Sequence, residues 1–329
     1  MKSAWDFLSF RALLALVCGF ALGLFPASLG AAPRKYPYKI TTTVGMVNDI
    51  VRNVAGDKAR CTAVMGAGVD PHLYKPTRDD VAAMIGSDVV FYSGLMLEGK
   101  MGDTLIKVGR SKPVFAVTEL IPPETLLEPA DFAGHYDPHV WMDPGAWGKA
   151  AEAVGKSLSG FDPENGAFYR KNAADYITSC AALSEYGKRV LSTVPENSRV
   201  LISSHDAFNY FGRAFNLKVM GVQGISTESE AGLRRINGLV DFIVKNNVKS
   251  VFVESSVSSK NIEALVGGVK ARGRDLKIGG ELFSDAMGRD GTYEGTYFGM
   301  LDHNITLVAR GLGGEAPRKG AGGKLSHVD

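Results

Sequence analysis

A long, unbroken helical pattern divides this chain into two stretches that each alternate strand and helix signals. The helical pattern starts after Asp162-Pro163 and continues without a strong breaker to about Thr193. At 1.5 Å per residue such a helix would span ~45 Å, about the height of the whole molecule. A helix of this length suits a connection between two lobes better than an element inside one.

The stretch before this helix carries short apolar runs of strand type, separated by segments whose apolar residues recur at helical spacing. Thr77 with Asp80 three residues later forms a capping box, the usual start of a helix. We expect strands at Ile40–Thr43, Arg60–Met65, Asp88–Tyr92 and Val114–Val117, and helices at Arg78–Ile85 and Pro144–Ser159.

The same alternation resumes after Pro195, and Thr227 with Glu230 forms another capping box there. We expect strands at Val200–Ser203, Leu217–Met220, Ser250–Val253 and Leu276–Ile278, and helices at Asp206–Phe215, Ser229–Lys245, Lys260–Arg272 and Glu294–Ala309. Two such halves predict an α/β fold of two (β/α) lobes, each with a mainly parallel sheet, facing a cleft. The expected boundaries are 36–160 for the first lobe, 161–194 for the linking helix and 195–312 for the second lobe. Residues 313–329 are glycine-rich and polar, which predicts a disordered tail.

Residues 1–32 have the pattern of a secretory signal peptide. Lys2 and Arg11 precede an apolar run from Ala12 to Leu24, and a small-residue stretch, Ser28–Ala32, suits cleavage. The apolar run is short for a membrane span. We therefore expect an exported, periplasmic protein. Cys18 could carry a lipid, but a bulky residue precedes it and the apolar run continues after it, so a lipid-anchored form is the less favoured expectation.

The charge balance gives no sign of a nucleic-acid partner. The chain carries 37 basic and 35 acidic residues, and removal of the signal leaves it close to neutral. A nearly neutral chain is not typical of proteins that bind nucleic acids. Cys61 and Cys180 lie far apart on a strand and a helix pattern, so we expect free thiols, although an oxidising compartment would permit a disulfide.

The tripeptide Asp-Pro-His occurs twice, ending at His72 and at His139. Proline fixes its own φ and biases the preceding residue towards extended backbone, so both histidines are expected on stiff turns. His205 closes the strand-like run Val200–Ser204, and Asp285 follows the run Lys277–Glu281. Because ligands of open α/β sheets bind beyond the carboxyl ends of the strands, each lobe offers two candidates to one cleft.

Three imidazoles and a carboxylate are enough to hold a divalent metal ion. Imidazole nitrogen suits zinc, iron and nickel, whereas carboxylate oxygen also suits manganese. The candidate ligands are His72, His139, His205 and Asp285. Each taken singly also has an ordinary structural interpretation, for example a hydrogen-bonded residue near a strand end or, for the carboxylate, a helix cap.

Other polar and aromatic residues near these positions have less specific interpretations. Glu254 ends a strand pattern and would either fix the tautomer of a ligand histidine or cap a helix. His135 is expected to be solvated, and His303 to be a packing or surface residue of the last helix. Trp141 and Tyr74 are expected to form the cleft wall.

Four segments resemble the cluster A-I solute-binding proteins of metal-importing ABC transporters, most closely the TroA-like zinc/manganese branch. The resemblance covers roughly Lys39 to Arg310. The segments are Asp70-Pro71-His72-Leu73-Tyr74, Asp137-Pro138-His139-Val140-Trp141, Ser204-His205-Asp206-Ala207-Phe208 and Glu281-Leu282-Phe283-Ser284-Asp285.

The resemblance implies two lobes joined by one rigid helix that limits opening, with one metal ion between them. It implies that the first lobe contributes His72 and His139 as ligands, and the second lobe His205 and Asp285. It also implies a non-enzymatic monomer that delivers the ion to an ABC permease driven by a cytoplasmic ATPase.

The resemblance also bears on which metal is carried. Manganese-selective relatives often have glutamate at the position of His205, so histidine there shifts the preference towards zinc. Zinc-dedicated relatives usually have a long loop rich in histidine and acidic residues before the second ligand, which residues 117–137 lack. We expect a carrier of zinc, manganese or both, with iron as a further candidate.

Two other functions compete with metal transport. A secreted zinc-dependent hydrolase would need an open metal position holding water and a nearby general base. Glu254 is the only evident base, and the chain contains no His-Glu-x-x-His motif. An adhesin-like surface protein is the third hypothesis.

Overall fold

The structure is a computed structural model that describes residues 35–326, so the expected signal sequence lies outside the described residues. Strands of the first half form a four-stranded parallel sheet in the order β2-β1-β3-β4. Its inner strand β3 is buried from Val89 to Phe91, as expected of a strand covered on both faces. The elements are β1 (Tyr38–Thr42), α1 (Gly45–Ala55), β2 (Ala59–Ala63), α2 (Arg78–Gly86), β3 (Val89–Tyr92), α3 (Gly102–Gly109) and β4 (Val114–Ala116).

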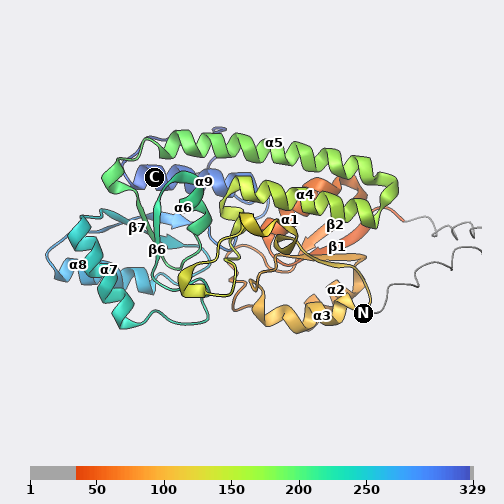
Figure 1. The fold of residues 1–329 in the computed structure, drawn as a ribbon, viewed down its shortest axis with the longest axis horizontal. Helices are drawn as coiled ribbons and strands as arrows, with labels where there is room; N and C mark the ends of the chain where they lie inside the picture. The colour runs from red at the N-terminus through yellow and green to blue at the C-terminus, as the bar shows by residue number, and fades with distance from the viewer. Residues whose placement is uncertain (1–34, 327–329) are drawn as a thin grey trace, which may run out of the picture. The chain divides into compact units, whose positions relative to one another are not determined.

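Strands of the second half form two parallel pairs, β5-β6 and β7-β8. The elements are β5 (Val200–Ser203), α6 (Asn209–Phe215), β6 (Lys218–Gly221), α7 (Leu233–Asn246), β7 (Ser250–Glu254), α8 (Lys260–Ala271), β8 (Lys277–Leu282) and α9 (Tyr297–Gly311). Figure 1 shows the two groups of strands side by side beneath one long helix. The predicted two-lobed α/β fold with parallel sheets is confirmed.

The long helix is α5 (Gly166–Leu191), which follows α4 (Pro144–Phe161) after a short 3-10 turn at Pro163–Asn165. It packs against α1 and α4 of the first half and against α6 and α9 of the second (Figure 1). The predicted connecting helix is therefore confirmed, although its regular part begins a few residues later than the sequence pattern indicated.

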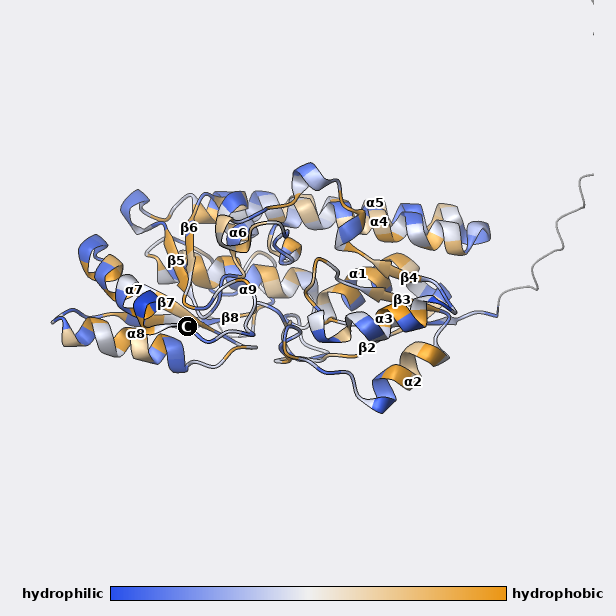
Figure 2. Cartoon of the chain, turned by 60° about the horizontal axis from the view of Figure 1, so that its bottom comes forward, coloured by the Kyte–Doolittle hydropathy of each residue, from blue (hydrophilic) through white to orange (hydrophobic). Residues whose placement is uncertain are grey.

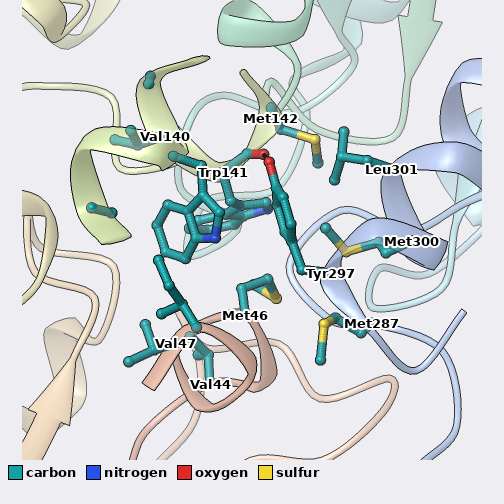
Figure 3. Packing of buried hydrophobic residues seen from close by; sticks show 14 of the residues in the cluster. Val44, Met46, Val47, Val140, Trp141, Met142, Met287, Tyr297, Met300 and Leu301 are labelled. Carbon is teal, nitrogen blue, oxygen red and sulfur yellow. Dashed lines mark hydrogen bonds between the residues drawn. The ribbon is translucent and has the colours of Figure 1, made fainter. Parts of the chain in front are cut away.

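The hydrophobic core does not stop at the boundary between the lobes. The larger of two buried clusters contains Ile40 of β1, Tyr176 of α5 and Leu301 of α9, while a smaller one lies under α7 and α8. Figure 2 shows apolar strands in both halves between helices that also carry polar residues. Figure 3 shows the region of the larger cluster where Met46 faces Trp141 and Tyr297. A shared core resists separation of the halves, because hinge opening would expose it.

Several helices begin later than the sequence predicts. The segments before α6, α7 and α9 were expected to be helical and instead form loops, whereas β8 extends beyond its expected end. The capping box expected at Thr227 and Glu230 is absent, because the Thr227 hydroxyl donates a hydrogen bond to Asp70 Oδ2 (2.6 Å). A contact distant in sequence therefore replaces the local one.

The described part of the expected tail, residues 313–326, is not disordered. Leu325 is buried, the Ala321 N–H donates to the Asp302 carboxylate, and Ser326 donates to Glu294. Gly320 has a φ of +72°, and a Cβ there would lie 2.4 Å from the Asp302 oxygens. The expectation was wrong because the glycines provide turns and close approach to α9 rather than freedom.

Candidate metal centre

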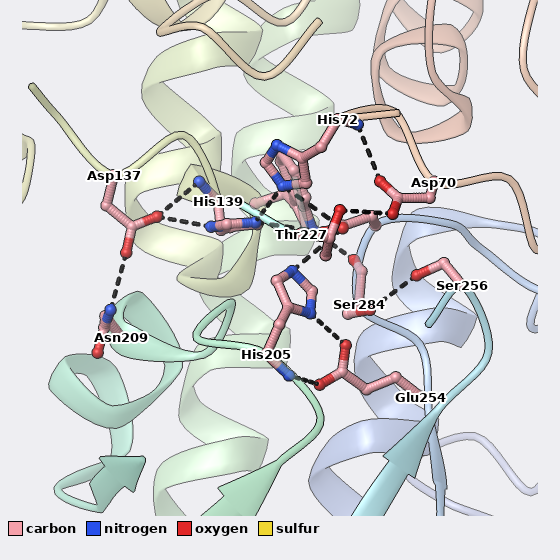
Figure 4. Close-up of polar contacts among 12 residues, drawn as sticks. Asp70, His72, Asp137, His139, His205, Asn209, Thr227, Glu254, Ser256 and Ser284 are labelled. Atoms are coloured by element: carbon pink, nitrogen blue, oxygen red, sulfur yellow. Dashed lines mark hydrogen bonds and ion pairs between the residues drawn. The ribbon is translucent and has the colours of Figure 1, made fainter. Parts of the chain in front are cut away.

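The four predicted ligand residues meet at one point between the two halves. One donor atom from each of His72, His139, His205 and Asp285 lies within 4.8 Å of the others. His205 follows β5, Asp285 follows β8, and all four side chains are buried. Figure 4 shows the three imidazoles turned towards a common centre. The structure thus brings together the residues that the sequence singled out.

The Nε2 atoms of the imidazoles surround the Asp285 carboxylate. His205 Nε2 lies 3.1 Å from Oδ2, and His139 Nε2 lies 3.3 Å from Oδ1. The Nε2 atoms of His72 and His139 are 3.4 Å apart. When the imidazoles are neutral and carry their proton on Nδ1, His205 Nε2 and both Asp285 oxygens are acceptors without a hydrogen-bond donor among the described residues.

Buried polar atoms without a partner are costly, at about 1–3 kcal/mol each. A cation bound among these atoms would satisfy them together. Three nitrogens with one or two carboxylate oxygens form a donor set typical of zinc and also acceptable to manganese and iron. The chemistry of the cluster therefore fits a divalent transition metal.

Both Asp-Pro-His tripeptides form the stiff turn that the sequence predicts. Asp70 Oδ1 accepts the backbone N–H of His72 (2.9 Å), and Asp137 Oδ1 accepts that of His139 (2.9 Å). In the second copy Asp137 Oδ1 also lies 2.8 Å from His139 Nδ1. This contact directs Nε2 of the same ring towards the centre, because the proton of the neutral imidazole is held at Nδ1.

Glu254 performs the corresponding task for His205. Its Oε1 accepts the His205 backbone N–H (2.9 Å), and its Oε2 lies 2.5 Å from His205 Nδ1. Glu254 is 3% exposed and ends β7. Of the two interpretations given by the sequence, the structure has the contact that fixes the histidine tautomer.

Sequence reasoning missed the residues that hold the loop of Asp285. The Asn304 side chain accepts the N–H of Phe283 (3.0 Å) and donates to its carbonyl (2.7 Å). Trp141 Nε1 donates to the carbonyl of Ser284 (2.9 Å). A signal for the first was available, since Asn304 is a buried polar residue on the apolar face of α9.

The remaining candidates lie as expected. His135 is exposed, and His303 is half-buried against Phe283 with its Nε2 donating to the Glu281 carbonyl. Cys61 and Cys180 are both free, and burial raises the pKa of each thiol to about 12, so neither is a reactive thiolate near neutral pH.

The ligand histidines differ in their proton affinity in the metal-free protein. Burial lowers the pKa of His72 to about 3. Burial also acts to lower the pKa of His139, but Asp137 and Asp285 outweigh it and raise that pKa to about 9. Glu254 and Asp285 likewise overcome burial and raise the pKa of His205 well above its usual value.

These shifts predict that metal binding at pH 7 releases about two protons per ion, because a metal displaces the protons of His139 and His205 but finds His72 neutral. Metal affinity should therefore rise with pH towards about 9 and fall in acid. Isothermal titration calorimetry at pH 7 in buffers of different ionisation enthalpy measures the proton count directly. A heat of binding that is independent of the buffer would contradict the prediction.

The same shift has a stability consequence in the metal-free protein. A raised pKa means that His139 stabilises the fold fully below its usual value of 6.5, and that this contribution is lost as the pH rises through about 9.

Replacing Glu254 with glutamine should lower metal affinity by about 10- to 100-fold, because the outer partner of a ligand histidine raises its basicity and fixes its orientation. Glutamine keeps the shape and one acceptor oxygen for His205 Nδ1. Competition with a chelator of known affinity measures the effect. Glu281→Gln is the matched control, since that side chain is exposed and its residue contacts His303 only through its carbonyl.

Known proteins resemble this chain in both sequence and overall architecture. A family model for the periplasmic zinc-uptake complex component A matches residues 40–311. The manganese-binding lipoprotein MntA of Bacillus subtilis (strain 168) is 44% identical over 274 residues, which are 83% of this chain and 89% of that protein. The zinc-binding protein TroA of Treponema pallidum (strain Nichols) is 41% identical over 302 residues, 90% of this chain and 97% of that protein. A solved structure of the Treponema pallidum protein matches with a TM-score of 0.81 over 84% of this chain and 99% of that one, at 41% identity.

Proposed function

The chain belongs to the family of the periplasmic zinc-uptake complex component A, and on that premise we propose that it captures a divalent transition metal outside the cytoplasm for import. The observation that carries the proposal is the buried cluster of three imidazoles and one carboxylate, contributed by both halves of the chain. A carrier needs this arrangement, because an ion held from both sides is shielded from water until the halves separate.

The proposed ligands are His72 and His139 from the first lobe and His205 and Asp285 from the second. We place the first lobe at 36–160, the linking helix at 161–194 and the second lobe at 195–312. The proposal is supported by His205 Nε2 and the two Asp285 oxygens, which lack a hydrogen-bond donor and which a cation would satisfy. One ion per chain fits a cluster of this size.

Zinc, manganese or both are the proposed cargo, with iron as a third candidate. The names of the relatives describe manganese binding for MntA and zinc binding for TroA. A donor set of mostly nitrogen atoms shifts the preference towards zinc, whereas an oxygen-rich set would favour manganese.

Release of the ion requires loss of contacts between the lobes. Thr227 holds Asp70 beside the ligand His72, and Lys100 Nζ lies 2.7 Å from the Glu228 carboxylate across the halves. The ion pair is partly exposed and contributes little stability by itself. With a shared core beneath them, these contacts support a small opening rather than a wide hinge motion.

The partners follow from the proposed transport role: an ABC permease receives the ion, and a cytoplasmic ATPase drives its passage. We propose a periplasmic, monomeric binding protein without enzymatic activity. Among the described residues no helix has both the length and the apolar character needed to cross a bilayer. The name of MntA describes a lipoprotein, so the expectation that a lipid-anchored form is less favoured is not supported. The mass of the exported chain decides whether Cys18, outside the described residues, carries a lipid.

A secreted zinc-dependent hydrolase fits the centre less well. Its general base would have to be Glu254, but both oxygens of that carboxylate are already engaged by His205. A base held in this way orients a ligand and does not activate water.

Titration of the purified metal-free protein tests the proposed function. We expect tight binding of one zinc or manganese ion per chain, observed by native mass spectrometry, with no hydrolysis of ester or peptide substrates. Turnover that tracks bound zinc would support the hydrolase instead. Failure to retain any of the three metals would refute the carrier.

A further inference from the structure

Trp141 contacts one ligand-bearing segment of each lobe. It follows His139 by two residues, and its ring lies 5.4 Å from the His139 ring in an edge-on arrangement. Its indole Nε1–H donates a 2.9 Å hydrogen bond to the carbonyl of Ser284, the residue immediately before Asp285. The side chain is fully buried, so neither contact is shared with water.

A second hydrogen bond runs in the opposite direction across the same boundary. The hydroxyl of Tyr297, the first residue of α9, donates to the backbone carbonyl of Trp141 (2.9 Å). Figure 3 shows Trp141 and Tyr297 in the shared core, where the hydroxyl of Tyr297 points towards the backbone of Trp141. The segment that carries His139 is therefore tied to the second half by two buried hydrogen bonds, one to the residue before Asp285 and one from the start of α9.

We propose that Trp141 is a positioning residue that couples the ligands His139 and Asp285 across the two lobes and thereby slows release of the bound metal. This inference rests on the proposed function. The Ser284 carbonyl belongs to the peptide unit that leads into Asp285, so the indole N–H fixes the direction from which the carboxylate enters the centre. Opening of the lobes must break this bond and expose a buried carbonyl, which adds to the barrier for release.

Trp147 provides a matched control within the same cluster. It is also fully buried, and its ring lies 6.4 Å from that of Trp141 and 5.8 Å from that of Tyr297. Unlike Trp141, its indole Nε1 has no hydrogen-bond partner. Replacing either tryptophan with phenylalanine removes the same atoms from the core, but only Trp141→Phe breaks a bond between the lobes.

The experiment compares release of Zn²⁺ from the wild-type chain, Trp141→Phe and Trp147→Phe, with an excess of chelator in a stopped-flow instrument. We expect release about tenfold faster for Trp141→Phe, the effect of losing one buried hydrogen bond, and a rate close to wild type for Trp147→Phe. The absorption spectrum of bound Co²⁺, which reports coordination geometry, should change in the first variant only. The melting temperature should fall further in Trp141→Phe, which loses a buried hydrogen bond, than in Trp147→Phe, which removes an indole N–H without a partner.

Each outcome bears on the inference. Equal release rates and unchanged Co²⁺ spectra in the two variants would overturn it while leaving the carrier function intact. Failure of the wild-type chain to bind zinc, manganese or iron would refute the proposed function, and the inference with it. If Trp141→Phe does not fold, Tyr297→Phe removes the reciprocal bond without altering either indole. It should also speed release, and an unchanged rate there would count against the coupling.

Discussion

Alanine in place of His139 is expected to weaken metal binding by more than about a hundredfold. This loss exceeds the effect expected for Glu254→Gln, which alters only the hydrogen-bond partner of a ligand. The substitution removes one of three imidazoles, and it leaves Asp137 Oδ1 without the contact to His139 Nδ1. It also leaves Asp285 Oδ1 without its closest nitrogen. Competition with chelators of graded affinity, for both zinc and manganese, measures the loss.

His135→Ala is the control for this prediction. That histidine lies four residues earlier, is exposed and is not part of the cluster. Its replacement should leave affinity unchanged. If His139→Ala bound metal as tightly as the wild type, the ligand assignment for the first lobe would be wrong.

Saturating metal should raise the melting temperature by roughly 10 °C relative to protein kept with a chelator. A free metal concentration about 1,000 times the Kd stabilises the folded state by ~4 kcal/mol, and each kcal/mol shifts the midpoint by about 2–4 °C in proteins of comparable size. The effect should be large because the donors come from both lobes, so the ion holds the halves together. Scanning calorimetry at pH 8 with and without a chelator measures it.

Two comparisons sharpen the stability test. At pH 5 the shift should shrink, because protons on His139 and His205 then compete with the metal. In His139→Ala the shift should largely disappear. Identical melting temperatures with and without metal in the wild-type chain would show that the ion does not bind the folded state.

Local sequence signals located most elements of the fold and the four candidate ligands. The capping box at Thr77 and Asp80 forms as predicted, since both partners lie within one helical turn. The candidate ligands could be found because proline stiffens the turns before His72 and His139, and because residues beyond the ends of parallel strands converge. Each of these rules depends on neighbours close in the chain or on a general property of α/β sheets.

Predictions failed where a distant contact replaced a local one. The sequence predicts a helix start at Thr227, but the Thr227 hydroxyl donates a hydrogen bond to Asp70 in the other lobe. Residues 313–326 were read as disordered from their glycine content, but Asp302 and Glu294 of the region around α9 bind their backbone. Composition reports how many conformations a segment can adopt, and a partner elsewhere selects one of them.

The sequence by itself determined which residue types occupy the strand ends, the stiffness of the two Asp-Pro-His turns and the alternation that produces two lobes. Only the tertiary structure decided the roles of Glu254 and of the two buried tryptophans. Trp141 and Trp147 have the same side chain at similar depth, yet the partner of the first lies 143 positions further along the chain and the second has none. Backbone preference depends on neighbours in sequence, whereas hydrogen bonding in a buried site depends on which segments the fold brings together.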